Sequence, residues 1–223
     1  MIAETKEQLL QASTEKREEI YSTVISAAPI SLSELNSEQT ALIIVDMING
    51  FVKKGALSSP NILAINKEVA TLLKICNSRK IKALCFADCH TNESPEFSFY
   101  PMHCLYGTEE SCVTSEIAEG NYTLIHKNST NGFLEPAFAE WLTANREIDT
   151  FVVVGCCTDI CIQQFALTLK ADFNRRNAKS RVIVPAMLSA TYDTPGHEAS
   201  LIDLVSFHNM MTNGVEVTAN FEY

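Results

Sequence analysis

The sequence predicts a doubly wound α/β fold, in which a parallel sheet is covered by helices on both faces. Short runs rich in β-branched residues alternate with segments of helical periodicity along most of the chain. The predicted strands are apolar on both faces, which is typical of parallel strands buried between two layers of helices. The length of 223 residues suits one hydrophobic core and is short for two full domains. These observations favour a single domain.

The first predicted element, residues 3–27, is an amphipathic helix that precedes the alternating pattern. Its apolar residues recur at helical spacing among many charges. They are Leu9, Leu10, Ile20, Val24 and Ile25. We expect this helix to pack on the outside of the domain, so residues 1–38 are assigned as a helical extension and residues 39–223 as the domain.

The strands and helices of the domain follow in alternation. Strands are predicted at residues 41–47, 82–88, 122–127, 150–156 and 181–187, with a less regular sixth at 215–221. Helices are predicted near residues 62–78, 134–146, 159–175 and 196–212. Residues 89–120 form a long irregular segment, and loops of that length in a compact domain are usually functional.

Composition and charge limit the partners of the protein. The formal charge is −10, so the surface repels nucleic acid and anionic membranes, and a small neutral ligand is the more natural partner. The N-terminus lacks the pattern of a secretion signal and no apolar run is long enough to span a bilayer, so we expect a cytoplasmic protein. The eight cysteines are then expected to be reduced, and to serve packing, metal binding or catalysis.

Polar residues stand where four of the predicted strands end. Asp46 ends the first strand, Asp88 the second and Lys127 the third. The fourth strand runs into the stretch Gly155–Cys161. In open parallel sheets, ligands bind beyond the carboxyl ends of the strands, so these residues should face one crevice. We expect Lys127 and the helix N-terminus to lower the pKa of Cys161, and Asp46 to accept the thiol proton.

Each of these residues also has an ordinary structural interpretation. Asp46 could cap the turn after its strand, and Lys127 could be a solvated strand end. Cys156 and Cys157 are typical of small buried hydrophobic side chains, and Cys161 alone could be part of the core. The prediction of a functional site depends on all of these residues lying together at the ends of neighbouring strands.

Three stretches of the sequence resemble the signatures of a known enzyme family. In this order and spacing, ALIIVDMINGF, KNSTNGF and VVVGCCTDIC are similar to the signatures of the isochorismatase-like cysteine hydrolases. The resemblance covers about residues 40–190 and implies a three-layer α/β/α fold around a six-stranded parallel sheet. It implies that Asp46, Lys127 and Cys161 are catalytic. It also implies a cis peptide bond before Cys157, with the backbone N–H groups of Cys157 and Cys161 as an oxyanion hole and Cys156 as a packing residue.

Within the family, the chain most resembles the nicotinamidases, which carry a metal site beside the catalytic residues. The corresponding residues here are Asp88, His90, Glu96 and His103, with Glu93 as an alternative to Glu96. This donor set suits Zn²⁺ best, and Fe²⁺ or Mn²⁺ as well. Met102 stands where many nicotinamidases have proline, which could alter the approach of His103. Without the resemblance, Asp88 and His90 would be ordinary loop residues.

The resemblance implies hydrolysis of nicotinamide to nicotinate and ammonia through a thioester, a step of pyridine nucleotide salvage. Phe51 and Tyr100 would be walls for the pyridine ring, although loop packing could also explain them. An amidase of the same family acting on a ureide or carbamoyl substrate is the nearest alternative. Isochorismatase itself does not use the cysteine, and a non-enzymatic redox or zinc module is more distant. Relatives are often dimers or tetramers, so a homo-oligomer is expected.

Overall fold

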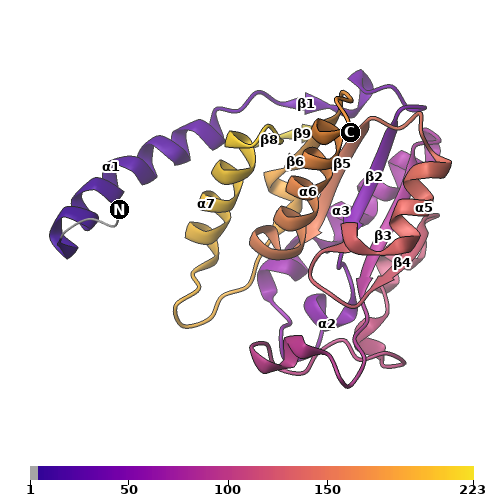
Figure 1. The fold of residues 1–223 in the computed structure, drawn as a ribbon, viewed down its shortest axis with the longest axis horizontal. Coiled ribbons are helices and arrows are strands. Elements are labelled where there is room, and N and C mark those ends of the chain that lie inside the picture. The colour runs from indigo at the N-terminus through magenta and orange to yellow at the C-terminus, as the bar shows by residue number, and fades with distance from the viewer. Residues whose placement is uncertain (1–4) are drawn as a thin grey trace.

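The computed structural model describes residues 5–223 and confirms the predicted parallel sheet between two layers of helices (Figure 1). Six strands lie in the order β4-β3-β2-β5-β6-β8, and all neighbouring pairs are parallel. Their bounds are Thr40–Val45 (β2), Lys82–Asp88 (β3), Thr123–Lys127 (β4), Thr150–Cys156 (β5), Arg181–Pro185 (β6) and Glu216–Thr218 (β8). A two-residue strand, β7 (Ser189–Ala190), pairs with the end of β5.

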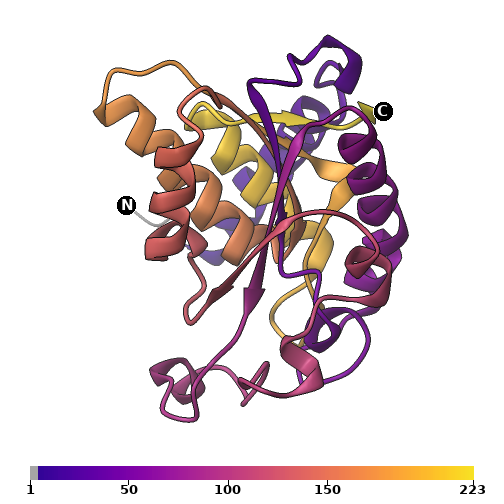
Figure 2. The same ribbon diagram turned by 90° about the vertical axis from the view of Figure 1, so that its right-hand side faces the viewer.

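The central strands are apolar on both faces because each face is covered by helices. Along β2, Leu42 and Ile44 point into one core, and Ala41 and Ile43 point into the other. The first core is closed by α3 (Pro60–Ser78), which begins at a Ser59 cap. The second core is closed by α5 (Pro136–Ala144), α6 (Gln163–Arg175) and α7 (Ala199–Thr212). In Figure 2 the sheet lies between α3 on the right and α5 and α6 on the left.

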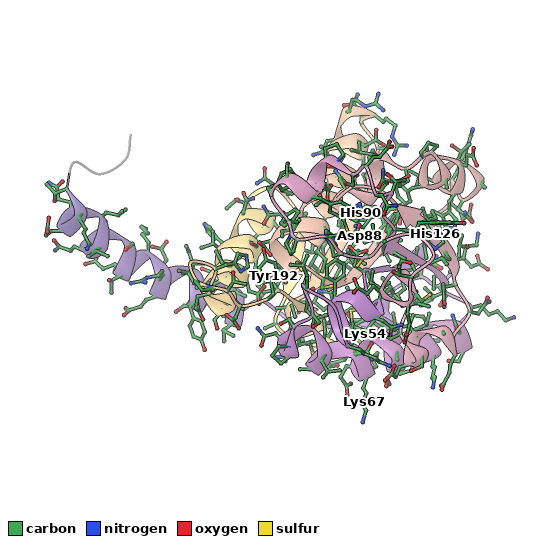
Figure 3. All side chains as sticks on the ribbon, turned by 90° about the horizontal axis from the view of Figure 1, so that it is seen from below. Lys54, Lys67, Asp88, His90, His126 and Tyr192 are labelled. Carbon is green, nitrogen blue, oxygen red and sulfur yellow. The ribbon has the colours of Figure 1, made fainter. Side chains whose placement is uncertain are left out.

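The strand order places a crevice between β2 and β5. The chain runs from β2 outward through β3 and β4, and then returns to place β5 on the other side of β2. Such a reversal leaves an opening at the carboxyl ends of the strands, where ligands bind in folds of this type. Asp46, Asp88, Lys127 and the turn after β5 all lie at this edge. Figure 3 looks onto it from below.

Several details differ from the predicted elements. The predicted strand 215–221 is divided into β8 and a short strand β9 (Phe221–Glu222), which pairs with β1 (Ile30–Ser31). The predicted helix 159–175 begins with a π-helical turn, Thr158–Ile162, before α6. Two one-turn helices were not predicted. They are α2 (Asn49–Val52) and α4 (Ser115–Ala118).

The N-terminal helix α1 (Lys6–Ile25) packs on the domain only through its last turns. Val24 is buried against the second core and Ile20 packs beside it, where α1 contacts α7. Toward its N-terminus the helix extends away from the body (Figure 1), and Leu9 and Leu10 are 49% and 52% exposed. The helix therefore packs on the outside of the domain, as predicted, through its last turns, while its first half makes little contact with the body. None of the helices in residues 5–223 is both long and apolar enough to cross a membrane.

The residues after α1 belong to the domain by their packing. Strand β1 pairs with β9 at the other end of the chain, and Leu32 and Leu35 lie in the first core. The division of the chain at residue 38 stays a prediction.

Candidate active site

The floor of the site is formed at the ends of β2 and β5, which lie close together at Gly155. Gly155 has a φ of +119°, and a Cβ there would lie 2.1 Å from the carbonyl oxygen of Val45, so glycine is required. Asp46 has a φ of 54°, a conformation uncommon for residues other than glycine. Its N–H donates to the carbonyl of Phe86 at 3.0 Å, and its own carbonyl accepts from the Cys156 thiol at 3.2 Å. Asp46 is thus held by both neighbouring strands.

Lys127 is a fully buried lysine at the centre of the site. Its Nζ lies 2.9 Å from Oδ2 of Asp46 and 2.5 Å from Oδ1 of Asp88. The same Nζ donates to the carbonyl of Ser129 at 3.2 Å and lies 3.7 Å from the sulfur of Cys161. Lys127 and Asp46 are 0% exposed and Cys161 is 5% exposed. The structure therefore brings together the three residues predicted as catalytic.

The surroundings push the pKa values of the two carboxyl groups apart. Burial raises the pKa of Asp46 to about 6, although the ammonium of Lys127 opposes the shift. Burial acts in the same direction on Asp88, but the ammonium of Lys127, together with the neighbouring His103 and His90, outweighs it and holds the pKa of Asp88 well below its usual range. Asp46 is therefore the carboxyl group that can exchange a proton near neutral pH.

The expected lowering of the Cys161 pKa is wrong. Burial raises the pKa of Cys161 well above that of a free thiol, and Lys127 offsets this only in part. The reason is its position: Cys161 lies within the π-helical turn and packs against the second core instead of standing at an open helix end. The resting sulfur is a thiol, so a base must remove its proton as it reacts.

The turn between β5 and α6 has the backbone that the resemblance implies. The peptide bond between Cys156 and Cys157 is cis. The carbonyl of Cys157 accepts from the N–H groups of Ile160 and Ile162 at 3.2 and 3.1 Å, which closes the turn that carries Cys161. The role of the Cys157 and Cys161 N–H groups as an oxyanion hole stays a prediction.

Beside Lys127 lies a second buried group, formed by Asp88, His90 and His103. One ligand atom from each lies within 4.8 Å of the others, so together they could hold a metal ion. Oδ2 of Asp88 is 3.3 Å from Nε2 of His90 and 3.5 Å from Nε2 of His103. Since Oδ1 of Asp88 contacts Lys127, this carboxylate joins the histidines to the residues predicted as catalytic.

The hydrogen bonds of the two histidines leave their Nε2 atoms available for a metal. Nδ1 of His103 donates to the carbonyl of Pro101 at 2.8 Å, which places the ring proton on Nδ1. Nδ1 of His90 lies 3.2 Å from Oδ1 of Asn128. Nε2 of His90 and Oε2 of Glu96 are buried, 3.8 Å apart, and have no hydrogen-bond partner among the described residues. Lone pairs that converge in this way fit a divalent cation.

Glu96, and not Glu93, faces this group. Oε1 of Glu96 accepts from the N–H of Thr130 at 3.1 Å, which leaves Oε2 directed at the histidines. Glu93 is exposed. Met102 is 57% exposed, so the residue that replaces proline points outward while His103 reaches the group.

A narrow pocket, with a free volume of about 20 Å³, opens over these groups. The predicted walls Phe51 and Tyr100 line it, with ring centroids 5.7 and 6.1 Å from that of His103. Four further lining residues were missed from the sequence: Leu57, Thr130, Ile160 and Tyr192. Ile160 stands within the cysteine-rich stretch and could have been found there. Tyr192 comes from a distant loop and carries no signal in the sequence, yet it lies beside the site, to one side of Asp88 and His90 (Figure 3).

Comparison with known proteins gives the family. Residues 40–215 match the sequence profile of the family described as Isochorismatase domain. The chain belongs to this family. It is 31% identical over 214 residues to Nicotinamidase 1 of Arabidopsis thaliana, which covers 86% of this chain and 87% of that protein. Family membership and the site together identify a hydrolase of the isochorismatase family.

Two solved structures share the fold. The pyrazinamidase of Pyrococcus horikoshii in complex with zinc is similar with a TM-score of 0.68 at 19% identity, over 83% of this chain and 99% of that chain. The N-carbamoylsarcosine amidase of Thermoplasma acidophilum is similar with a TM-score of 0.64 at 26% identity, over 81% and 95%.

Proposed function

We propose that this chain is a cysteine amidohydrolase that converts nicotinamide to nicotinate and ammonia. The central observation is the ammonium of Lys127, which contacts both the carboxylate of Asp46 and the sulfur of Cys161 on the floor of the pocket. Amide hydrolysis needs a nucleophile, a base for the proton of that nucleophile and an acid for the leaving amine. Cys161 supplies the first, and Asp46 supplies the other two in turn.

In the first half of the reaction, the amide carbonyl carbon lies over Cys161. Asp46 takes the thiol proton as the sulfur attacks this carbon, and the electron pair of the C=O bond moves onto oxygen. The N–H groups of Cys157 and Cys161 donate to that oxyanion. When the carbonyl re-forms, the C–N bond breaks and Asp46 gives its proton to the amine. Ammonia leaves, and the acyl group remains as a thioester on Cys161.

In the second half, water attacks the thioester carbon and Asp46 accepts a proton from it. The C–S bond then breaks, Asp46 returns the proton to the sulfur, and the acid that leaves loses its remaining proton to water to become nicotinate. Lys127 stays charged throughout: burial lowers its pKa, but Asp46 and Asp88 outweigh this and raise the pKa well above its ordinary value. Its ammonium therefore stabilises whichever of Asp46 and Cys161 carries the negative charge.

A divalent metal ion, best Zn²⁺, would be held by Asp88, His90, His103 and Glu96. When bound, the ion would supply a Lewis-acid contact for the ring nitrogen of a pyridine. Two of these donors, Nε2 of His90 and Oε2 of Glu96, are the buried atoms that lack hydrogen-bond partners in the described structure.

The likeness to an N-carbamoylsarcosine amidase supports a second candidate, a carbamoyl or ureide substrate. Two features favour the pyridine amide. The pocket is lined by three aromatic side chains, Phe51, Tyr100 and Tyr192, which suit a flat ring. The buried donor group beside it suits a ligand with a ring nitrogen, and the relative at 31% identity is named a nicotinamidase.

Ammonia release from a panel of amides tests the proposal. The panel holds nicotinamide, pyrazinamide and N-carbamoylsarcosine, and the same sample is analysed for metals. We expect the highest kcat/KM for a pyridine or pyrazine amide, and about one divalent ion per chain. Turnover of N-carbamoylsarcosine alone would favour the second candidate. Absence of all turnover, with reversible oxidation of the cysteines, would favour a redox module.

A further inference from the structure

The loop between β7 and α7, residues 191–198, closes one side of the pocket through Tyr192. Thr194 and His197 exchange backbone hydrogen bonds of 3.0 and 2.9 Å, which makes a tight turn around Pro195 and Gly196. Gly196 has a φ of +88°, as the residue after proline has in a type II turn. The Pro-Gly turn reverses the chain and brings His197 back onto Tyr192.

His197 has a hydrogen-bond acceptor at each ring nitrogen. Its Nδ1 lies 2.8 Å from the carbonyl oxygen of Tyr192, and its Nε2 lies 3.0 Å from Oδ2 of Asp159. A carbonyl and a carboxylate only accept, so the protonated ring satisfies both. Burial lowers the pKa of His197, but the contacts with Asp159 and the Tyr192 carbonyl outweigh it and raise this pKa, which favours the imidazolium. The ring of Tyr192 lies flat on it, with centroids 4.2 Å apart and an interplanar angle of 8°. A cation over an aromatic face stabilises this stack.

Asp159 connects the loop to the nucleophile. It lies in the π-helical turn, two residues before Cys161. While Oδ2 meets His197, Oδ1 accepts from the hydroxyl of Thr191 at 2.6 Å. One carboxylate therefore binds both ends of the loop. The side chains of His197 and Asp159 are 19% and 16% exposed, so water screens this ion pair less than it screens a surface pair.

A separate set of hydrogen bonds holds the base of the loop to α3. Asp193 accepts from Nδ2 of Asn61 and from the N–H of Ala199, both at 2.8 Å. Asn61 also donates to the carbonyl of Thr191 at 3.2 Å. Because none of these bonds involves His197, loss of its side chain should make Tyr192 more mobile without unfolding the base of the loop.

We propose that Asp159 and His197 form a latch that fastens the loop 191–198 to the turn carrying Cys161, and so fixes Tyr192 as a wall of the substrate pocket. His197 is a positioning residue: it acts on the substrate through Tyr192 and takes no part in bond making. The identity of the substrate rests on the proposed function, whereas the latch itself does not. Its expected effect is on substrate binding more than on the chemical step.

Steady-state kinetics with nicotinamide test the effect on binding. His197→Ala should raise KM about 10-fold while kcat changes less than about 3-fold, because the loss falls on ground-state binding. If the two side chains act as one unit, Asp159→Ala combined with His197→Ala should raise KM no further than the worse single variant. The matched control is His126→Ala, an exposed histidine on β4 that does not line the pocket, which should leave both constants unchanged. A fall in kcat with KM unchanged would overturn the assignment.

Hydrogen exchange of the free protein tests the latch without any substrate. The amides of residues 192–197 should exchange about 10-fold faster in His197→Ala than in the wild type, because local opening of this part of the loop becomes easier. They should exchange at the wild-type rate in His126→Ala. Faster exchange in a protein that does not hydrolyse nicotinamide would keep the latch and refute the proposed function. Unchanged exchange would refute the latch. If His197→Ala does not fold, His197→Gln, which keeps one donor for Asp159, should give a smaller change in the same direction.

Discussion

The proposed catalytic edge of the sheet, where Asp46 and Lys127 lie, and helix α1 show opposite relations between polarity and burial. At the edge, Lys127 and Asp46 are charged and have no exposed surface. In α1, Leu9 and Leu10 are apolar and about half exposed, at 49% and 52%. A buried charge is costly unless partners compensate it, whereas a single exposed leucine costs little. Substitutions at this edge should therefore have large effects on stability and on the proposed activity. Substitutions in the first half of α1 should have small effects on both.

The largest difference between the two regions should appear in the reaction itself. Cys161→Ala removes the nucleophile and should lower kcat for ammonia release by roughly 10³-fold or more. The control is Cys112→Ala, because Cys112 is the exposed thiol among the eight cysteines and should be dispensable. A Cys161→Ala variant that keeps a tenth of the wild-type rate would show that the sulfur is not the attacking group.

Substitution of one lysine in each region compares how much the two regions contribute to the stability of the fold. Lys127→Met leaves the carboxylates of Asp46 and Asp88 buried without their cation, and should lower the free energy of unfolding by about 3–5 kcal/mol in addition to abolishing turnover. Lys16→Met in α1 breaks only the surface ion pair with Glu19 and should change nothing measurable. Urea unfolding of both variants decides the matter. Equal stabilities would mean that the buried cluster is not held together by Lys127.

The pH dependence of the reaction gives a smaller effect at the same edge. Asp46 must be ionised to accept the thiol proton, and burial raises its pKa to about 6. An acid is ionised above its pKa, so kcat/KM should be steady above this pH and fall about tenfold per pH unit below it. A profile of kcat/KM from pH 4 to 8 measures this fall. If kcat/KM instead began to fall near pH 4, the ordinary pKa of an aspartate, burial would not control the pKa of Asp46.

The two regions also differ in how much the sequence predicts. Asp46, Lys127 and Cys161 stand at the ends of strands with a strong apolar pattern, and the topology of a parallel sheet brings such ends together. The direction of the Cys161 pKa shift could not be predicted, because it depends on how deeply the turn packs against the second core. For α1, helical periodicity correctly predicts a helix, but periodicity does not say how far the helix stays in contact with the body.

The long-range contacts of the loop 191–198 could likewise not be predicted from the sequence. Tyr192 and His197 lie more than thirty residues from Asp159 along the chain, and the contact depends on a Pro-Gly turn whose direction is a property of the folded state. The turn itself could be predicted from the Pro195-Gly196 pair. What the turn brings together could not, because that requires the relative placement of β5, β7 and α7.

The smallest effect should come from shortening α1. Removal of residues 1–18 takes away the exposed Leu9 and Leu10 but keeps Ile20 and Val24, which pack on the second core. Because little apolar area is lost from the interior, we expect kcat/KM within about twofold and a Tm within about 2 °C of the full chain. The measurements are ammonia release and thermal unfolding, with Val24→Ala in the full chain as the comparison that does lose buried area. Loss of activity on truncation would show that the exposed half of α1 acts on the catalytic edge through a contact absent from the described residues of one chain, such as a second copy of the protein.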